Sequence, residues 1–272
     1  MNLVDLSTTS LAFVDRGDGV PVLLVHGFPL DHTMWDAQIE ALAGSCRVIA
    51  PDLRGFGRSP LGNINVERGV SMEQYAEDLA ELLEALAVVE SIVLVGFSMG
   101  GYVAWQFMRK HPERVRALVQ CDTRSAADSD DARAARIKIA ESVANTGSGP
   151  VADAMLPKLL SPRTLESGAP VVARVRAMIE RTGPAAIAAA QRGMAARPDV
   201  SELLPKISVP TLVLCGEQDA ISPPREMQAI AEAIPNAEFL VIPGVGHMTT
   251  MENPQAVNDA LVRFVEGVGR KS

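Results

Sequence analysis

The stretch SIVLVGFSMGG, residues 91–101, decides the fold of this 272-residue chain, because it predicts a strand that turns sharply into a helix. The apolar run Val93–Val95 is of the kind that is buried in a parallel sheet. Gly96 and Gly100 then flank Ser98 at the spacing G-x-S-x-G, and a helical pattern follows. Such a turn strains the serine backbone and lifts the hydroxyl to a helix N-terminus, where amide N–H groups favour developing negative charge. We therefore expect Ser98 to be a nucleophile.

A glycine-rich turn between a strand and a helix can also cradle a phosphate. A dinucleotide-binding fingerprint needs a second glycine where this chain has Ser98. A nucleotide-binding Walker loop needs a Gly-Lys-Ser/Thr ending, which this turn lacks. The turn therefore favours nucleophilic catalysis over phosphate binding.

Composition and charge indicate an ordinary soluble protein of one large α/β domain. The net charge of −8 and the lack of a basic stripe argue against a nucleic-acid partner. Residues 1–10 lack the basic stretch followed by an apolar stretch that is typical of a signal peptide. No apolar run reaches the length of a membrane span. The odd set Cys46, Cys121 and Cys215 indicates buried, reduced thiols. We expect a cytoplasmic protein with no membrane partner.

Strand and helix patterns alternate along most of the chain, which predicts a mostly parallel sheet with helices on both faces. The expected strands are residues 11–14, 20–25, 47–50, 93–95, 115–121, 210–215 and 238–242. The alternation stops between them at residues 124–207, which are rich in Ala, Arg and Pro and contain no convincing strand. We therefore predict an α/β core of residues 1–123 and 208–272, with a helical cap of several short helices, residues 124–207, inserted in it.

A serine hydroxyl needs a base to become a nucleophile at neutral pH. Of the four histidines, His247 follows the last expected strand in a Gly-Val-Gly-His loop. Loops at that end of a parallel sheet meet at the ligand crevice, so His247 is the expected base. His26, His32 and His111 stand at a strand end or at helix ends, where they more simply support local structure.

The base in turn needs an acid that fixes its tautomer. Asp219 follows the expected strand 210–215, whereas its rival Asp122 follows strand 115–121. Both give the chain order Ser, Asp, His, and Glu217 is a weaker alternative. We favour Asp219 because its strand directly precedes the strand of His247.

Acyl transfer also needs two N–H donors for the oxyanion. Met99 follows the nucleophile directly and is expected to supply one of them. Gly27 permits a tight turn after strand 20–25, which points the Phe28 amide inward as the second donor. This chemistry requires no metal ion and no organic cofactor.

In these residues the chain resembles the α/β-hydrolase superfamily, whose successive signatures occur here in order and span nearly the whole sequence. They are His26-Gly27-Phe28-Pro29, Asp52-Leu53-Arg54-Gly55-Phe56-Gly57-Arg58-Ser59, Gly96-Phe97-Ser98-Met99-Gly100-Gly101, Gly216-Glu217-Gln218-Asp219 and Gly246-His247. The resemblance implies an eight-stranded, mostly parallel sheet, a helical lid over the site, and an acid after strand 210–215. Within the superfamily the chain is similar to small bacterial esterases and enol-lactonase-like hydrolases. Haloalkane dehalogenases and epoxide hydrolases resemble this fold but place an aspartate where Ser98 stands.

The sequence thus predicts a serine hydrolase that cleaves esters or lactones of small molecules through an acyl-enzyme on Ser98. The same residues also suit a cofactor-free perhydrolase of the haloperoxidase type, or a small-molecule receptor that has lost turnover. Arg124 and Trp105 are candidate substrate-binding residues, although a surface position for Arg124 and a core position for Trp105 are the simpler interpretations. Three methionines are candidates for the apolar lining of the site: Met155, Met178 and Met194. No pattern predicts the substrate or the oligomeric state.

Overall fold

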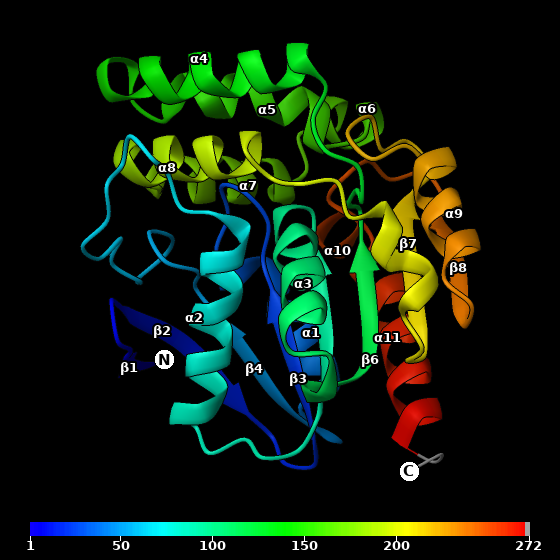
Figure 1. Ribbon diagram of the computed structural model, residues 1–272. Coiled ribbons are helices and arrows are strands. Elements are labelled where there is room, and N and C mark those ends of the chain that lie inside the picture. Colours follow the sequence, from blue (N-terminus) through cyan, green and yellow to red (C-terminus); the bar gives the residue numbers. More distant parts are fainter. Residues whose placement is uncertain (270–272) are drawn as a thin grey trace.

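One mostly parallel sheet forms the centre of the molecule in the computed structural model, which describes residues 1–269 (Figure 1). Its eight strands lie in the order β1-β2-β4-β3-β5-β6-β7-β8. Strands β3 to β8 are parallel to their neighbours within that group, and β1 and β2 form antiparallel pairs at one edge. The strands are β1 (Asn2–Asp5), β2 (Ser10–Arg16), β3 (Val20–Val25), β4 (Cys46–Pro51), β5 (Ile92–Phe97), β6 (Val115–Cys121), β7 (Thr211–Gly216) and β8 (Ala237–Ile242).

Helices cover both faces of the sheet, which is why its central strands are continuous apolar runs. Helices α2, α3 and α9 lie on one face, and α1 and α11 lie on the other (Figure 1). Helix α2 begins at the cap residue Ser71, whose side chain accepts a hydrogen bond from the Gln74 N–H, and it buries an apolar stripe against the sheet. The core helices are η1 (His32–Trp35), α1 (Asp36–Leu42), α2 (Met72–Ala85), α3 (Met99–Lys110), η2 (Pro112–Arg114), α9 (Pro224–Ala233), α10 (Thr249–Glu252) and α11 (Pro254–Gly269).

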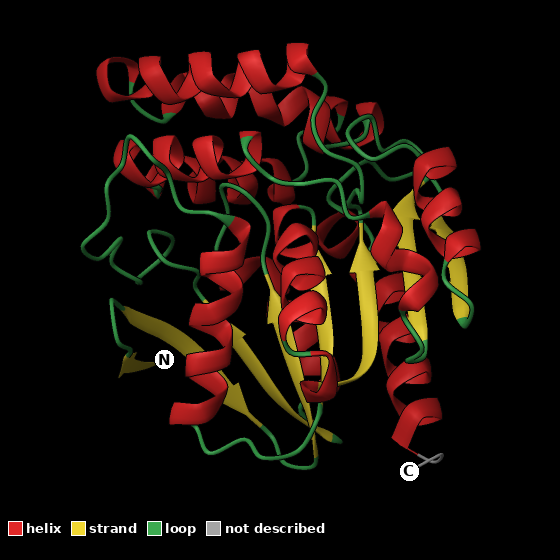
Figure 2. Ribbon diagram, viewed as in Figure 1, coloured by secondary structure: helices red, strands yellow, loops and turns green. Residues whose placement is uncertain are grey.

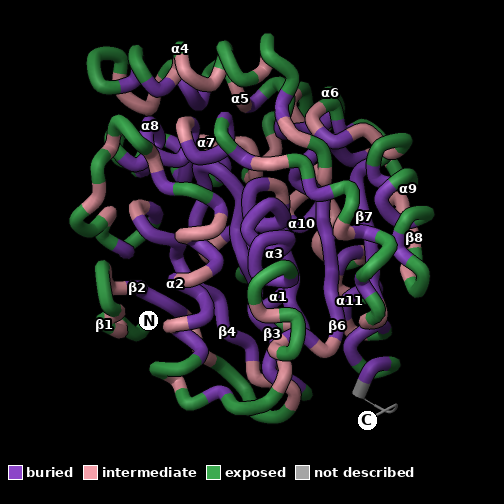
Figure 3. Tube along the Cα trace, viewed as in Figure 1, coloured by how far each residue is buried: buried purple, intermediate pink, exposed green. Residues whose placement is uncertain are grey.

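Five further α-helices lie between β6 and β7 in the chain and form a layer above the carboxyl ends of the strands (Figure 2). They are α4 (Asp130–Thr146), α5 (Gly149–Leu159), α6 (Pro162–Glu166), α7 (Pro170–Arg181) and α8 (Pro184–Ala195), followed by η3 (Ser201–Lys206). Helix α4 is the outermost of them, and of its 17 residues Ala140 and Val143 are the buried ones (Figure 3). Strands are absent from this stretch, all of which the structure describes.

The predicted eight-stranded α/β fold is confirmed, and two details differ from the sequence-based expectations. Strand β1 was missed because it is a short, mostly exposed edge strand, so no buried apolar pattern marks it. The inserted helices are not all short, since α4 is a helix of more than four turns. The predicted core reaches residue 272, and residues 270–272 lie outside the described part.

The three cysteines are buried and unbridged, as predicted. Within residues 1–269, no helix has both the length and the apolar character that a membrane span requires.

Candidate active site

Ser98 stands in the sharp turn between β5 and α3, at the carboxyl edge of the sheet. Its backbone has φ 52° and ψ −114°, a strained conformation for a residue with a side chain. The turn requires Gly100, because a Cβ there would lie 2.2 Å from the carbonyl oxygen of Val25. Close packing of the helix start against β3 therefore holds Ser98 at the apex of the turn.

A chain of hydrogen bonds links Ser98 to two side chains from distant parts of the sequence. His247 Nε2 lies 2.9 Å from Ser98 Oγ, and His247 Nδ1 lies 2.8 Å from Asp219 Oδ2. His247 and Asp219 follow β8 and β7, so the carboxyl ends of three strands bring the residues together. The ring of Phe97 packs against His247 at a centroid distance of 5.1 Å.

Asp219 is held as a carboxylate although it is buried. Burial by itself raises the pKa of this carboxyl, but the adjacent His247 and two backbone donors outweigh that effect and lower it. The donors are the N–H groups of Ile221 and Ser222, which lie 2.7 Å and 2.9 Å from Asp219 Oδ1. The free oxygen, Oδ2, is thereby aimed at the imidazole.

Asp122, the alternative acid, lies close to the same histidine. Side-chain ligand atoms of Asp122, Asp219 and His247 all lie within 4.8 Å of one another. The Asp122 carboxyl, however, accepts hydrogen bonds from the Gly216 N–H and the Thr249 hydroxyl. Burial and the nearby Asp219 charge raise the pKa of Asp122 well above its ordinary value, which favours its neutral form. The described geometry thus joins Asp219, rather than Asp122, to His247.

The N–H groups of Phe28 and Met99 are the predicted oxyanion donors. Within the described chain neither makes a hydrogen bond, and Met99 is the first residue of α3. His26 supports the loop that carries Phe28, since its Nε2 accepts from the Leu53 N–H at 2.9 Å and its Nδ1 lies 2.8 Å from the Gly27 carbonyl oxygen. The role expected for His26, support of a loop, agrees with these contacts.

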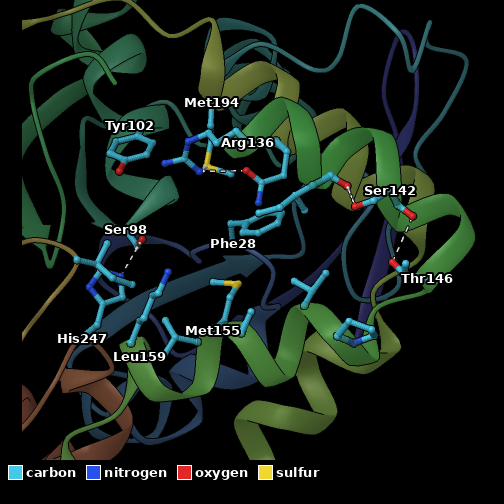
Figure 4. A pocket seen from close by; sticks show the side chains of 17 residues that line it. Phe28, Ser98, Tyr102, Arg136, Ser142, Thr146, Met155, Leu159, Met194 and His247 are labelled. Atoms are coloured by element: carbon cyan, nitrogen blue, oxygen red, sulfur yellow. Dashed lines mark hydrogen bonds between the residues drawn. The ribbon is translucent and has the colours of Figure 1, made fainter. Parts of the chain in front are cut away.

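A cavity of about 350 Å³ opens over Ser98 and His247, within the size range of small-molecule sites (Figure 4). One wall comes from α4 and α8, and the other comes from α5. Most of the lining is apolar, and two of the candidate methionines, Met155 and Met194, belong to it. The full lining is Phe28, Ser98, Tyr102, Arg136, Ile139, Ser142, Thr146, Pro150, Val151, Ala154, Met155, Lys158, Leu159, Gln191, Met194, Ile221 and His247.

Arg124 and Trp105, the residues expected to bind substrate, do not line this cavity. The Arg124 side chain pairs with Glu226 on α9 at 2.9 Å, outside the cavity. Trp105 is buried in α3, where its indole N–H donates to the Arg124 carbonyl oxygen at 3.0 Å. Met178 is buried within α7. We therefore correct these three expectations, since each side chain is used in packing or in a surface ion pair.

The polar lining of the cavity was missed from the sequence. Arg136, Lys158 and Gln191 come from three different inserted helices, α4, α5 and α8. Their sequence neighbourhood, rich in Ala and Arg, distinguishes none of them from exposed helix residues. Only the way the helices pack turns these side chains toward Ser98.

The family of this chain follows from its sequence as well as from its fold. A model of the alpha/beta hydrolase family matches residues 22–260, and the chain belongs to that family.

Among solved structures, a thermophilic esterase from Thermogutta terrifontis, with malate bound, superimposes with a TM-score of 0.95. It is 46% identical over 98% of this chain and 99% of its own. The enol-lactonase from Burkholderia xenovorans LB400 has a TM-score of 0.89 and 25% identity, over 97% of this chain and 100% of its own. A putative non-heme bromoperoxidase, BpoC, from Mycobacterium tuberculosis is 30% identical over 95% of this chain and 98% of its own. These likenesses place the chain in an esterase and enol-lactonase-like branch.

Proposed function

We propose that this protein is a serine hydrolase that cleaves carboxylic esters or lactones of small molecules. The observation that carries the proposal is the unbroken hydrogen-bond chain from Ser98 Oγ through His247 to the buried carboxylate of Asp219. In a free serine the hydroxyl is a weak nucleophile, and such a chain supplies the base that it needs. The similarity to an esterase and to an enol-lactonase supports the same reaction class.

In the proposed reaction, Ser98 Oγ attacks the carbonyl carbon while His247 Nε2 takes the hydroxyl proton. Asp219 stabilises the imidazolium that forms, and the N–H groups of Phe28 and Met99 bind the oxyanion. The imidazolium then protonates the leaving alkoxide, which departs as an alcohol and leaves an ester on Ser98. Water, deprotonated by His247, attacks that ester and releases the carboxylic acid and the free serine. No metal or organic cofactor takes part in these steps.

The helices α4–α8 serve as the cap in this proposal. They place apolar side chains around the cavity, so a bound ester is surrounded mostly by carbon rather than by water. A lower local polarity strengthens the interaction of the oxyanion with its two N–H donors.

The test is hydrolysis of 4-nitrophenyl butyrate by the wild type and by Ser98→Ala. We expect turnover in the wild type and none above the buffer rate in Ser98→Ala. A matched control is Ser167→Ala, since Ser167 is exposed at the end of α6, and it should keep full activity. Full activity in Ser98→Ala would refute the proposal, and a fluorophosphonate probe should label the wild type but not that variant.

A second candidate, perhydrolysis, is favoured by the 30% identity to the putative bromoperoxidase. Here hydrogen peroxide replaces water as the group that attacks the acyl-Ser98 ester, so the product is a peracid. The peracid transfers an oxygen atom and its proton to bromide, giving hypobromous acid and the carboxylate. Bromination of a dye in acetate, peroxide and bromide would show this activity, and its loss in Ser98→Ala would assign it to the same site.

A further inference from the structure

The cavity over Ser98 has an unusual charge balance for this chain. The protein carries a net charge of −8, yet none of the described residues that line the cavity is Asp or Glu. Arg136 and Lys158 both line it. An apolar cavity for a neutral ester has no need of two cations. Their presence in the lining therefore bears on the charge of the ligand.

Arg136 shares a buried carboxylate with a second guanidinium group. Its Nε lies 2.6 Å from Asp128 Oδ2, and Arg197 Nη1 lies 2.7 Å from Asp128 Oδ1. Two guanidinium groups therefore share one carboxylate, which is 2% exposed. Arg197 also stacks over the Tyr102 ring, with its central carbon 4.2 Å from the ring centroid. Of these two guanidinium groups, that of Arg136 lines the cavity and that of Arg197 does not.

The hydrogen bonds of Arg136 leave donors for a ligand. Its Nη1 donates to Gln191 Oε1 at 3.2 Å and to Met194 Sδ at 3.3 Å, and its Nη2 makes no hydrogen bond to another described residue. Because the Gln191 oxygen is engaged by Arg136, the NH₂ end of that amide remains, and an NH₂ group is a donor. Both side chains line the cavity, so guanidinium and amide donors are presented together.

Lys158 supplies a second cation near the base. It makes no ion pair within the described chain, and it lies in α5 directly before Leu159. The Leu159 carbonyl oxygen accepts from the Met248 N–H at 3.0 Å, which ties this end of α5 to the residue after His247. Figure 4 shows Ser98 and His247 at one end of the cavity and Thr146 at the other, with Arg136 extending over the Ser98 end.

We propose that the cavity selects esters that carry a carboxylate close to the ester bond, and that Arg136 and Lys158 bind this carboxylate. Guanidinium and carboxylate groups form charge-assisted hydrogen bonds, which are stronger than neutral ones. The net negative charge of the chain repels an anion at long range, so these two cations are needed to admit one. This inference rests on the proposed ester hydrolysis and names its substrate class.

The test compares esters that differ only in a carboxylate in place of a methyl group. The first three pairs are monomethyl succinate with methyl butyrate, monomethyl glutarate with methyl pentanoate, and monomethyl adipate with methyl hexanoate. The fourth pair is acetoxyacetate with ethyl acetate. Titration of released acid gives kcat/KM for each, and the ratio within a pair measures the carboxylate preference. We expect a ratio above about ten in at least one pair at low ionic strength, falling as salt is added.

Two variants and one control assign that preference to the named residues. Arg136→Gln should lower the carboxylate preference about tenfold, because Arg136 is half-buried. Lys158→Gln should lower it about threefold, because Lys158 is exposed. Lys158 makes no ion pair with a described residue, so its variant tests the idea even if Arg136→Gln folds poorly. Lys138→Gln removes an exposed charge from α4 that does not line the cavity, and it should leave the ratio unchanged.

The outcomes separate this inference from the proposed function. Hydrolysis without carboxylate preference in any pair, or a preference that both variants retain, would overturn the inference alone. Absence of hydrolysis would overturn the proposed function. In that case calorimetric titration of Ser98→Ala with monomethyl adipate and with methyl hexanoate still decides the inference. Tighter binding of the anionic ester, lost when Arg136→Gln is added, would support it, and equal binding of the two esters would refute it.

Discussion

Replacing Asp219 by Asn is the sharpest test of the arrangement around His247. The Asp219 and His247 side chains are at most 1% exposed and are joined at 2.8 Å. In Asp219→Asn the amide oxygen still accepts from the backbone N–H groups of Ile221 and Ser222, so the NH₂ group faces His247 Nδ1. The imidazole must then carry its proton on Nε2, where it can no longer accept the proton of Ser98.

The same loss of tautomer control costs about 10⁴ in kcat in a serine protease, which corresponds to roughly 5 kcal/mol of barrier. We expect a decrease of that order here, measured with 4-nitrophenyl butyrate after circular dichroism has shown that the variant is folded. Asp122→Asn is the matched control. Because the environment of Asp122 favours a neutral carboxyl, an amide there removes no charge, and we expect less than about a tenfold loss. Similar losses in both variants, or a larger loss for Asp122→Asn, would refute the reasoning.

Two further predictions concern stability, and both are read from urea unfolding. Gly100→Ala forces a Cβ against the Val25 carbonyl oxygen and should lower the free energy of unfolding by about 3 kcal/mol or more. The control is Gly149→Ala, where a Cβ has nothing within 4 Å, and it should be neutral or slightly stabilising. Equal effects of the two substitutions would contradict the packing argument. Burial alone lowers the pKa of His32, but the hydrogen bond with Asp52 and the Asp52 charge outweigh burial and raise the pKa. The stabilisation of the folded state by this pair is therefore fully present below about pH 6.5 and is lost as pH rises through the folded-state pKa. His32→Gln should therefore destabilise the protein more at about pH 5.5 than at about pH 9, and a pH-independent difference would count against this.

The sequence was most informative where a single strand and its following loop carry the signal. The β5 turn needs Gly96 and Gly100 for steric reasons that act within a few residues, so the motif predicted both the turn and Ser98. The positions of Asp219 and His247 followed from strand order, because parallel strands end at the same edge of the sheet.

Features that depend on packing between distant segments were not predictable. The lining of the cavity is set by how α4, α5 and α8 face one another, and residues such as Arg136 and Trp105 have the same local pattern whether they face a cavity or a neighbour. The closeness of Asp122 to His247 likewise depends on Thr249 and Gly216, which hold its carboxyl from other parts of the chain. Such contacts leave no periodic trace in a single sequence.

The outermost position of α4 has a consequence for how a ligand reaches the interior. This helix forms part of one wall of the cavity and packs on α8, and its buried residues are Ala140 and Val143, whereas α3 buries ten residues. Separating α4 from its neighbours therefore exposes less apolar surface than separating α3 from the sheet. Local opening there costs far less free energy than unfolding any strand of the sheet. Entry and departure of ligands can therefore proceed through breathing of the outer layer while Ser98, on the rigid inner layer, keeps its alignment with His247.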